Sequence, residues 1–259
     1  MTQRLGSRRG GNLGAVFDEP FLWRAEAASA LGLDGDDLVA ALCPGASYPA
    51  ALRSMLAALP PGIDRLVDLG AGPGAASEWF RVRTGATVSA VEPSAGGRWV
   101  AQGLFPHLDV VEGTAEHSTL PAGVADVVTL CGLLSLVRDA DAVLDEVERI
   151  AADEATLAIA DLCSHDARVI SGPNVFRRID DLASLVTRRG WRVVEVGCGS
   201  PNVDPGWAET AARVDEWLQE RCAGRPGYAA MIADRDHLAR HVESGELLAG
   251  TVVATRRRA

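Results

Sequence analysis

The chain has 259 residues, of which 47% are apolar and 23% charged, and its formal net charge is −10. This composition is typical of a globular protein with a single large core. The negative charge argues against a nucleic-acid substrate, because binding to phosphates depends on clustered basic residues. It is better suited to a cationic ligand.

Neither a membrane span nor a disulfide framework is indicated. No apolar run reaches the roughly 18 residues that a span requires, and the basic start of the chain has no apolar segment behind it, so we expect a cytoplasmic protein. The five cysteines stand far apart and form no C-x-x-C pair, so we expect free thiols without a zinc site. The sequence contains no lysine, which excludes Schiff-base chemistry by a lysine side chain.

The N-terminal part of the chain is predicted to be helical. After a flexible segment at residues 1–14, three helical patterns follow within residues 15–62, which we expect to form an N-terminal helical cap. Their sequences are FLWRAEAASALG, DDLVAALC and YPAALRSMLAAL, and PPG closes them off.

Strands and helices alternate through residues 63–200. Asp139 is a candidate N-cap for one of the helices, and Gly85 and Gly190 are candidate stops for two others. Alternation of this kind predicts a mostly parallel sheet with helices on both faces. The predicted strands contain IDRLVDL, ATVSAVE, LDVVEG, ADVVTLC, ATLAIADL and WRVVEVG.

Two amphipathic helices follow in residues 201–246, before a closing strand and a basic tail at 247–259. We expect the two helices to form a lid inserted before the last strand. The fold class is therefore α/β: one Rossmann-like domain with a seven-stranded sheet, an N-terminal helical cap and a helical insertion.

The stretch LVDLGAGPGAASEWF, residues 66–80, fits two different nucleotide patterns. Read through Gly70, Gly72 and Ala75, it matches the dinucleotide pattern G-x-G-x-x-G/A. Read through Gly70, Gly72 and Gly74 behind Asp68, it fits a sulfonium cofactor instead.

Electrostatics decides between these two readings. A dinucleotide loop offers backbone N–H groups to a pyrophosphate. Here Asp68 would place a negative charge near the phosphates, and Pro73 removes one N–H donor. S-adenosylmethionine has no phosphate, and it carries a sulfonium and an ammonium group. Glu92, at the end of the second strand, could accept hydrogen bonds from both hydroxyls of its ribose.

Together these motifs resemble class I S-adenosylmethionine-dependent methyltransferases, in particular the small-molecule branch that is similar to ubiquinone-biosynthesis enzymes. The likeness extends over about residues 60–197. It implies that VDLGAGPG surrounds the methionine part of the cofactor, that VEGTAEHSTLP reaches the adenine, and that ADVVTLCGLLSLV contributes backbone contacts. The implied product is S-adenosylhomocysteine. The implied cofactor residues are Asp68, Gly70, Ala71, Gly72, Gly74, Glu92, Pro93, Thr114, Ala115, Glu116, Leu130 and Cys131.

The sequence departs from this family pattern in three places. Thr114 stands where an aspartate is frequent, and ERIAADEATL lacks the usual Pro-Gly-Gly turn. Residues 133–135 are Leu-Leu-Ser, where many relatives carry a histidine. No general base is therefore assigned there. His165 lies just past the fifth strand, at the carboxyl edge of the sheet where ligands collect, and is the catalytic candidate as a general base. His117, Asp161 and Tyr48 are further titratable candidates.

His237 and His241 share a helix face, but the H-E-x-x-H glutamate is absent, so we expect an ordinary charged face and no metal. Trp23, Tyr48 and Trp207, together with Trp217, could pack the helical appendages or line a pocket.

The function predicted from these residues is methyl transfer to a small organic acceptor, in bacterial secondary metabolism. The alternative is a relative that binds S-adenosylmethionine without transferring the methyl group, as a cyclisation or elimination enzyme or as a structural subunit. A homodimer and a partner protein both stay open.

Overall fold

The computed structural model describes residues 13–43, 48–164, 169–171, 174–200 and 204–256. The predicted flexible N-terminus up to residue 12, the catalytic candidate His165 and the tail from residue 257 lie outside the described residues. The helices are α1 (Leu13–Ala30), α2 (Gly35–Leu42), α3 (Pro49–Ala58), α4 (Ala75–Thr84), α5 (Ala95–Leu104), α6 (Ala140–Ile150), α7 (Ile179–Arg188), α8 (Pro205–Cys222) and α9 (Tyr228–Glu243). The strands are β1 (Arg65–Leu69), β2 (Thr87–Glu92), β3 (Asp109–Glu112), β4 (Ala125–Cys131), β5 (Ala151–Ser164), β6 (Val169–Ser171), β7 (Asn174–Phe176), β8 (Arg192–Gly199) and β9 (Leu247–Thr255).

Seven strands form one sheet in the order β3-β2-β1-β4-β5-β9-β8, which confirms the predicted fold class. The first five strands of this order run parallel, and β9 runs antiparallel to both β5 and β8. Parallel strands need helical crossovers, and the alternation of strands and helices in the sequence supplies them.

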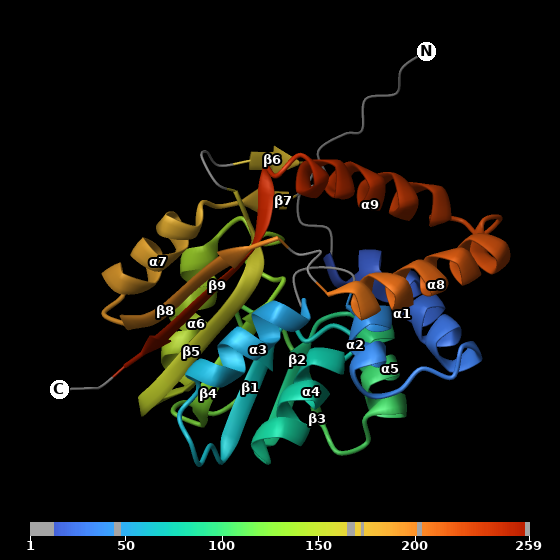
Figure 1. Ribbon diagram of the computed structural model, residues 1–259. Helices are drawn as coiled ribbons and strands as arrows, with labels where there is room; N and C mark the ends of the chain where they lie inside the picture. Colours follow the sequence, from blue (N-terminus) through green and yellow to red (C-terminus); the bar gives the residue numbers. More distant parts are fainter. Residues whose placement is uncertain (1–12, 44–47, 165–168, 172–173, 201–203, 257–259) are drawn as a thin grey trace.

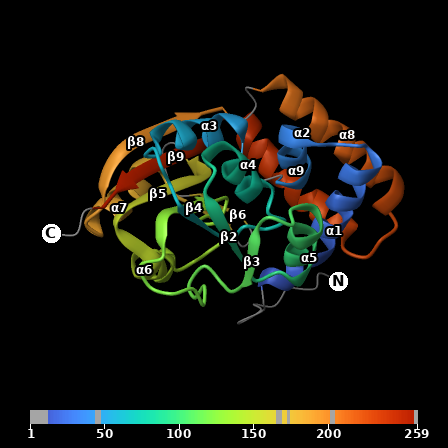
Figure 2. The same cartoon turned by 90° about the horizontal axis from the view of Figure 1, so that it is seen from below.

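Both faces of the central strands of this sheet are buried, and alternate residues of these strands point to different cores. Leu66 packs in a core with residues of α1 to α5 and α8, whereas its neighbour Val67 packs in a second core with α6 and α7. Leu157 and Ala158 of β5 divide between the two cores in the same way. This explains the continuous apolar runs of the central strands. Figure 2 shows α6 on the side of the sheet opposite α3 and α4.

The inserted helices α8 and α9 lie on the side of the molecule where α1 and α2 lie, away from α6 and α7 (Figure 1). Helix α8 packs against both α1 and α2, and α9 contacts β9. The two helical segments at opposite ends of the sequence therefore meet in space. Within the described ranges, no helix is long and apolar enough to cross a bilayer.

Two elements of the fold were not predicted. Helix α5 contains Gly96, Gly97 and Gly103, which lower its intrinsic helix propensity, but Ser94 caps it by accepting from the N–H of Gly97 at 2.9 Å. A short hairpin of β6 and β7 also follows β5.

Helix α3 contacts β5, β8 and β9, so it belongs to a layer on the sheet, although the sequence predicts it as part of the N-terminal cap. The candidate cap Asp139 does begin α6, because its carboxylate accepts from the N–H of Ala142 at 3.1 Å. Gly85 ends α4 in a left-handed conformation. These two signals depend on local chemistry alone, which is why the sequence reveals them.

Candidate functional site

The strand order reverses between β1 and β4, and the candidate site lies at this point. The chain leaves β1 toward β2 on one side, and it returns across β1 to β4 on the other. In open α/β sheets such a reversal leaves a crevice at the carboxyl ends of the strands, where ligands bind. The glycine loop, residues 70–74, follows β1 at this edge, and Gly132 follows β4.

The glycine loop requires its glycines. Gly70, Gly72 and Gly74 have φ angles of 73°, 57° and 81°, which side chains other than glycine rarely adopt. The N–H groups of Gly70 and Ala71 both donate to the carbonyl of Val91, at 2.9 and 3.0 Å, so the loop is fixed to the end of β2.

Two apolar side chains border this loop. A Cβ atom added to Gly72 would lie 3.3 Å from the ring of Phe21 in α1, and one added to Gly70 would lie 2.7 Å from a methyl group of Leu133. Helix α1 and the segment after β4 therefore cover the loop from two directions.

Glu92 lies beside the glycine loop, as the sequence predicts. Its side chain is buried, with 6% of the residue exposed. One carboxylate oxygen accepts from the N–H of Gly72 at 2.7 Å, and the other accepts from the N–H of Ser94 at 2.7 Å. Burial raises the pKa of Glu92, and these two backbone donors oppose the increase. The carboxylate thus joins the end of β2 to the loop after β1.

Asp68 is buried below the loop and has two hydroxyl partners. It accepts from Ser77 of α4 at 2.6 Å and from Thr129 of β4 at 2.8 Å. Burial raises the pKa of Asp68 to about 6, against the effect of the two hydroxyls. Both carboxylate oxygens are therefore engaged in joining β1 to its neighbours, a role that the sequence did not reveal.

The segment predicted to reach the adenine is a tight turn. Thr114 and His117 exchange two backbone hydrogen bonds of 3.1 Å, and Ala115 between them is buried. The turn is fixed by Ser118, whose N–H donates to Glu146 of α6 at 2.7 Å. Glu116 is exposed.

The segment after β4 is held by a second buried carboxylate. Leu130 is buried, Cys131 is half-buried, and the N–H of Gly132 donates to the carbonyl of Ala160 at 2.7 Å. Asp161 accepts from the N–H of Ser135 at 2.8 Å, and burial raises the pKa of Asp161 to about 6. As a candidate base, Asp161 is thus already engaged in a structural contact.

Helix α1 contributes a polar contact that sequence analysis missed. Asp18 accepts from the hydroxyl of Ser94 at 2.6 Å and from the N–H of Gly96 at 2.9 Å. A Cβ on Gly96 would lie 2.5 Å from the carbonyl oxygen of Asp18, so the two helices touch through their backbones. Beyond the glycines themselves, no local pattern in the sequence reveals these contacts, because Asp18 is 76 residues from Ser94 and 78 residues from Gly96.

The other candidates do not converge on the glycine loop. His117 is exposed, and Tyr48 lies between α2 and α3. The rings of His237 and His241 are 4.8 Å apart, and His241 contacts Glu246 at 2.6 Å. In the part of the chain that the structure describes, no group of three metal-ligating side chains occurs.

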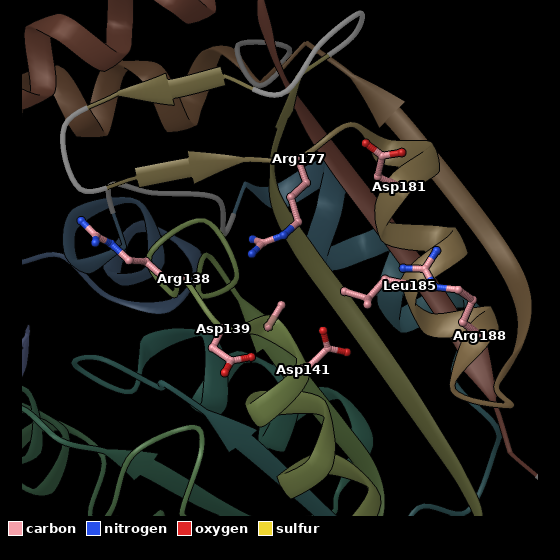
Figure 3. Close-up of a pocket in the computed structure, with 8 residues that line it drawn as sticks. Arg138, Asp139, Asp141, Arg177, Asp181, Leu185 and Arg188 are labelled. Carbon is pink, nitrogen blue, oxygen red and sulfur yellow. The ribbon is translucent and has the colours of Figure 1, made fainter.

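A cavity of about 270 Å³ lies between the segment after β4, the start of α6, and α7. Figure 3 shows the residues that line it. Most of the side chains that line it belong to arginine and aspartate, including Arg138 and Asp181. Arg177, which reaches into the cavity, donates to the carbonyls of Leu134 and Val137 and thereby holds the segment after β4. None of the predicted cofactor residues lines this cavity.

Comparison with known proteins agrees with this geometry. Residues 67–159 match the model of a family described as a methyltransferase domain. This part of the chain is similar to a methyltransferase domain. The matched range begins inside β1 and ends in β5, so it contains the glycine loop, Glu92 and the adenine segment. No curated protein sequence matches the chain.

Solved structures show the same fold at low sequence identity. The [4+2]-cyclase SpnF has a TM-score of 0.65 and 15% identity, over 80% of this chain and 81% of its own. Geranyl diphosphate C-methyltransferase from Streptomyces coelicolor A3(2) has a TM-score of 0.61 and 13% identity, over 80% and 75%. The cyclopropane synthase MmaA2 from Mycobacterium tuberculosis has a TM-score of 0.60 and 15% identity, over 80% and 83%.

The raised pKa of Asp68 predicts a specific pH dependence of stability. The native state favours the protonated carboxyl, so the free energy of unfolding falls as pH rises from about the ordinary value of 3.8 to about 6. The fall is roughly 3 kcal/mol, the equivalent of two pKa units. Asp68→Asn removes this contribution. The free energy of unfolding in urea should be measured for both proteins between pH 4 and pH 7. The variant should become more stable relative to the wild type as pH rises, and a difference that does not change with pH would contradict this account of Asp68.

Proposed function

We propose that this domain transfers a methyl group from S-adenosylmethionine to a small organic acceptor. The observation that carries the proposal is the position of Glu92, whose buried carboxylate lies beside a glycine loop at the point where the strand order reverses. A ribose needs two adjacent hydrogen-bond acceptors, and a carboxylate offers them.

The proposed binding site follows from the geometry of three segments. Gly70, Ala71, Gly72 and Gly74 would hold the methionine part of the cofactor, and Glu92 would hold the ribose, with Pro93 next to it. The turn at residues 114–116 would lie against the adenine, and Leu130 and Cys131 would contribute through their backbones. Phe21 and Leu133 border the loop, where they would exclude water from the reacting groups.

The chemistry of the loop supports a cofactor without phosphate. Pro73 has no N–H to offer, and Asp68 lies below the loop with 1% of its surface exposed. A buried carboxylate that is engaged with two hydroxyls would repel a pyrophosphate but attract a sulfonium or an ammonium group. Binding of such a cation would also favour the ionised form of Asp68.

Methyl transfer requires little acid or base chemistry from the protein. The acceptor's nucleophile forms a bond to the methyl carbon as the bond from sulfur breaks, and the sulfonium becomes the neutral thioether of S-adenosylhomocysteine. Any proton on the acceptor passes to a base or to water. Most of the rate enhancement can then come from holding the two reactants in line.

The acceptor is proposed to belong to bacterial secondary metabolism or to quinone-type biosynthesis. A chain rich in arginine and free of lysine suits a GC-rich bacterial genome. The similar structures include enzymes that act on small molecules, such as geranyl diphosphate. A chain with the fold of SpnF could also use the bound cofactor without transferring its methyl group.

Methyl-labelled S-adenosylmethionine tests the proposal directly. Incubation of the full chain with a bacterial metabolite extract should place the label in a small molecule, with S-adenosylhomocysteine as the second product. Heat-inactivated protein is the control. Tight cofactor binding without any labelled product would instead support the non-methylating alternative.

His165 remains the proposed general base if the acceptor is a phenol, an alcohol or an ammonium group. If His165 removes the proton from the acceptor, His165→Ala should lower the rate of single-turnover methyl transfer roughly a hundredfold. A rate controlled by positioning predicts a loss of about tenfold or less. The His107→Ala variant is a matched control, because His107 is exposed in the turn between α5 and β3.

A further inference from the structure

The two halves of helix α1 are held in different ways. Beyond Pro20, the side chains of Trp23 and Ala28 are buried in a core that they share with strands of the sheet. The side chains of residues 17–22 are half-buried or exposed. Pro20 lies inside the helix and has no N–H to donate to the carbonyl one turn earlier, so the helix lacks one hydrogen bond at this point. The first half of α1, which ends at residue 22, is therefore less firmly held than the second.

The first half of α1 places an aromatic pair beside the glycine loop. The rings of Phe17 and Phe21 stack with their centroids 5.7 Å apart and an angle of 22° between their planes. A Cβ atom on Gly72 would lie 3.3 Å from the ring of Phe21, so the space beside this glycine is filled by that ring. Displacement of the first half of α1 would thus uncover the loop without opening the core.

A carboxylate in the same half of the helix attaches it to α5. Asp18 accepts from the hydroxyl of Ser94 at 2.6 Å and from the N–H of Gly96 at 2.9 Å. Both donors belong to the N-terminal end of α5, where the helix dipole stabilises a negative charge. The hydroxyl of Ser94 and, to a smaller extent, the N–H of Gly96 lower the pKa of Asp18, so this carboxylate is ionised at neutral pH.

Two successive glycines allow the start of α5 to fit between α1 and the loop. A Cβ atom on Gly96 would lie 2.5 Å from the carbonyl oxygen of Asp18, and one on Gly97 would lie 3.0 Å from the carbonyl oxygen of Gly72. Neither Gly96 nor Gly97 has a positive φ, so their backbone conformation does not require glycine. Glycine also lowers helix propensity relative to alanine. Close approach of the backbones is therefore the physical reason for glycine at both positions.

These contacts form a closed ring around the glycine loop. Glu92 accepts from the N–H groups of Gly72 and Ser94, both at 2.7 Å. Gly72 lies beside Phe21, and Asp18, three residues before Phe21 on the same side of α1, returns to Ser94. Breaking the ring at Asp18 would leave the contacts of Glu92 in place and release only the first half of α1.

We propose that Asp18 is a positioning residue for the cofactor. Together with the contact at Gly96, it holds the first half of α1, and with it Phe21, over the glycine loop. This half moves about Pro20 when S-adenosylmethionine enters or S-adenosylhomocysteine leaves. The role in cofactor exchange rests on the proposed function, whereas the attachment of the helix does not.

The dissociation rate of S-adenosylhomocysteine from the immobilised full chain, measured by surface plasmon resonance, tests the proposal. Asp18→Ala removes the acceptor, and Gly96→Ala pushes the two helices apart while raising the intrinsic helix propensity of α5. Both variants should raise the dissociation rate at least about tenfold. A general loss of folded protein would instead lower the amount bound and leave the dissociation rate of the bound fraction unchanged, and this outcome would overturn the proposal.

Three further variants are matched controls. Asp18→Asn keeps an oxygen that can accept from both donors, so its dissociation rate should stay within about threefold of that of the wild type. Glu19→Ala removes the neighbouring exposed carboxylate, and Gly103→Ala adds a methyl group to α5 where no described atom lies within 4 Å. Both should release S-adenosylhomocysteine at the wild-type rate. Acceleration in Glu19→Ala or Gly103→Ala to the same extent as in Asp18→Ala would overturn the role of the contact between α1 and α5.

Hydrogen exchange without any ligand tests the attachment of α1 by itself. In Asp18→Ala and Gly96→Ala, the amides of residues 17–22 should exchange at least about tenfold faster than in the wild type. The amides of residues 23–30 should be unaffected, because the second half of the helix stays in the core. Unchanged exchange at residues 17–22, or faster exchange along the whole helix, would overturn the proposal that Asp18 holds one half of α1.

Failure of this proposal can be distinguished from failure of the proposed function. Binding of S-adenosylhomocysteine by the wild type, with equal dissociation rates in Asp18→Ala and Gly96→Ala, would overturn the role of Asp18 alone. Absence of binding by the wild type would overturn the proposed function together with the role in cofactor exchange. The exchange at residues 17–22 would still decide how α1 is held.

Discussion

The carboxylate of Glu92 holds together the parts of the molecule that form the site. Its two oxygens accept from the backbone of Gly72 and of Ser94, so the loop after β1 and the start of α5 are both fixed to the end of β2. Helix α1 is attached to the same point, because Asp18 accepts from Ser94. Two carboxylates, Glu92 and Asp18, thus link the glycine loop, α5 and α1 to the end of β2.

Other buried carboxylates at the site are also engaged with the protein itself. Asp68 and Asp161 accept hydrogen bonds from hydroxyl or backbone donors, and Glu146 holds the turn at residues 114–117 through Ser118. Hydrogen bonds from Arg149 and Ser118 outweigh burial and lower the pKa of Glu146 to about 2. These groups fix loops in place, and this is the arrangement expected of a catalyst that depends on positioning more than on proton transfer.

Local chemistry explains which features could be predicted from the sequence. Apolar runs reveal the central strands because both faces of the sheet are buried there, and the glycines at 70, 72 and 74 reveal the loop because only glycine tolerates its φ angles. The position of Glu92 beside the loop could be predicted because Glu92 ends a predicted strand. Helix α5 was missed because its glycines hide the helical pattern, while contact with α1 stabilises it.

Pairs that are distant in the sequence could not be predicted. Arg24 and Asp215 are separated by 191 residues, and no periodic pattern connects them. Both side chains line a cavity between α1, α2, α8 and α9, and the aromatic residues of the two helical segments are its only signal in the sequence. The structure shows that these segments meet, and that one face of α1 extends from the glycine loop to the cavity.

The most direct test of the account is calorimetric titration of S-adenosylmethionine into the Glu92→Ala variant. Losing a charge-assisted partner should weaken binding by roughly 1 to 3 kcal/mol. Glu112→Ala is the matched control, because Glu112 is aligned with Glu92 on the neighbouring strand but is 77% exposed. We expect the control to bind as the wild type does. An unchanged affinity in Glu92→Ala, with the fold retained by circular dichroism, would contradict the assignment of the cofactor site.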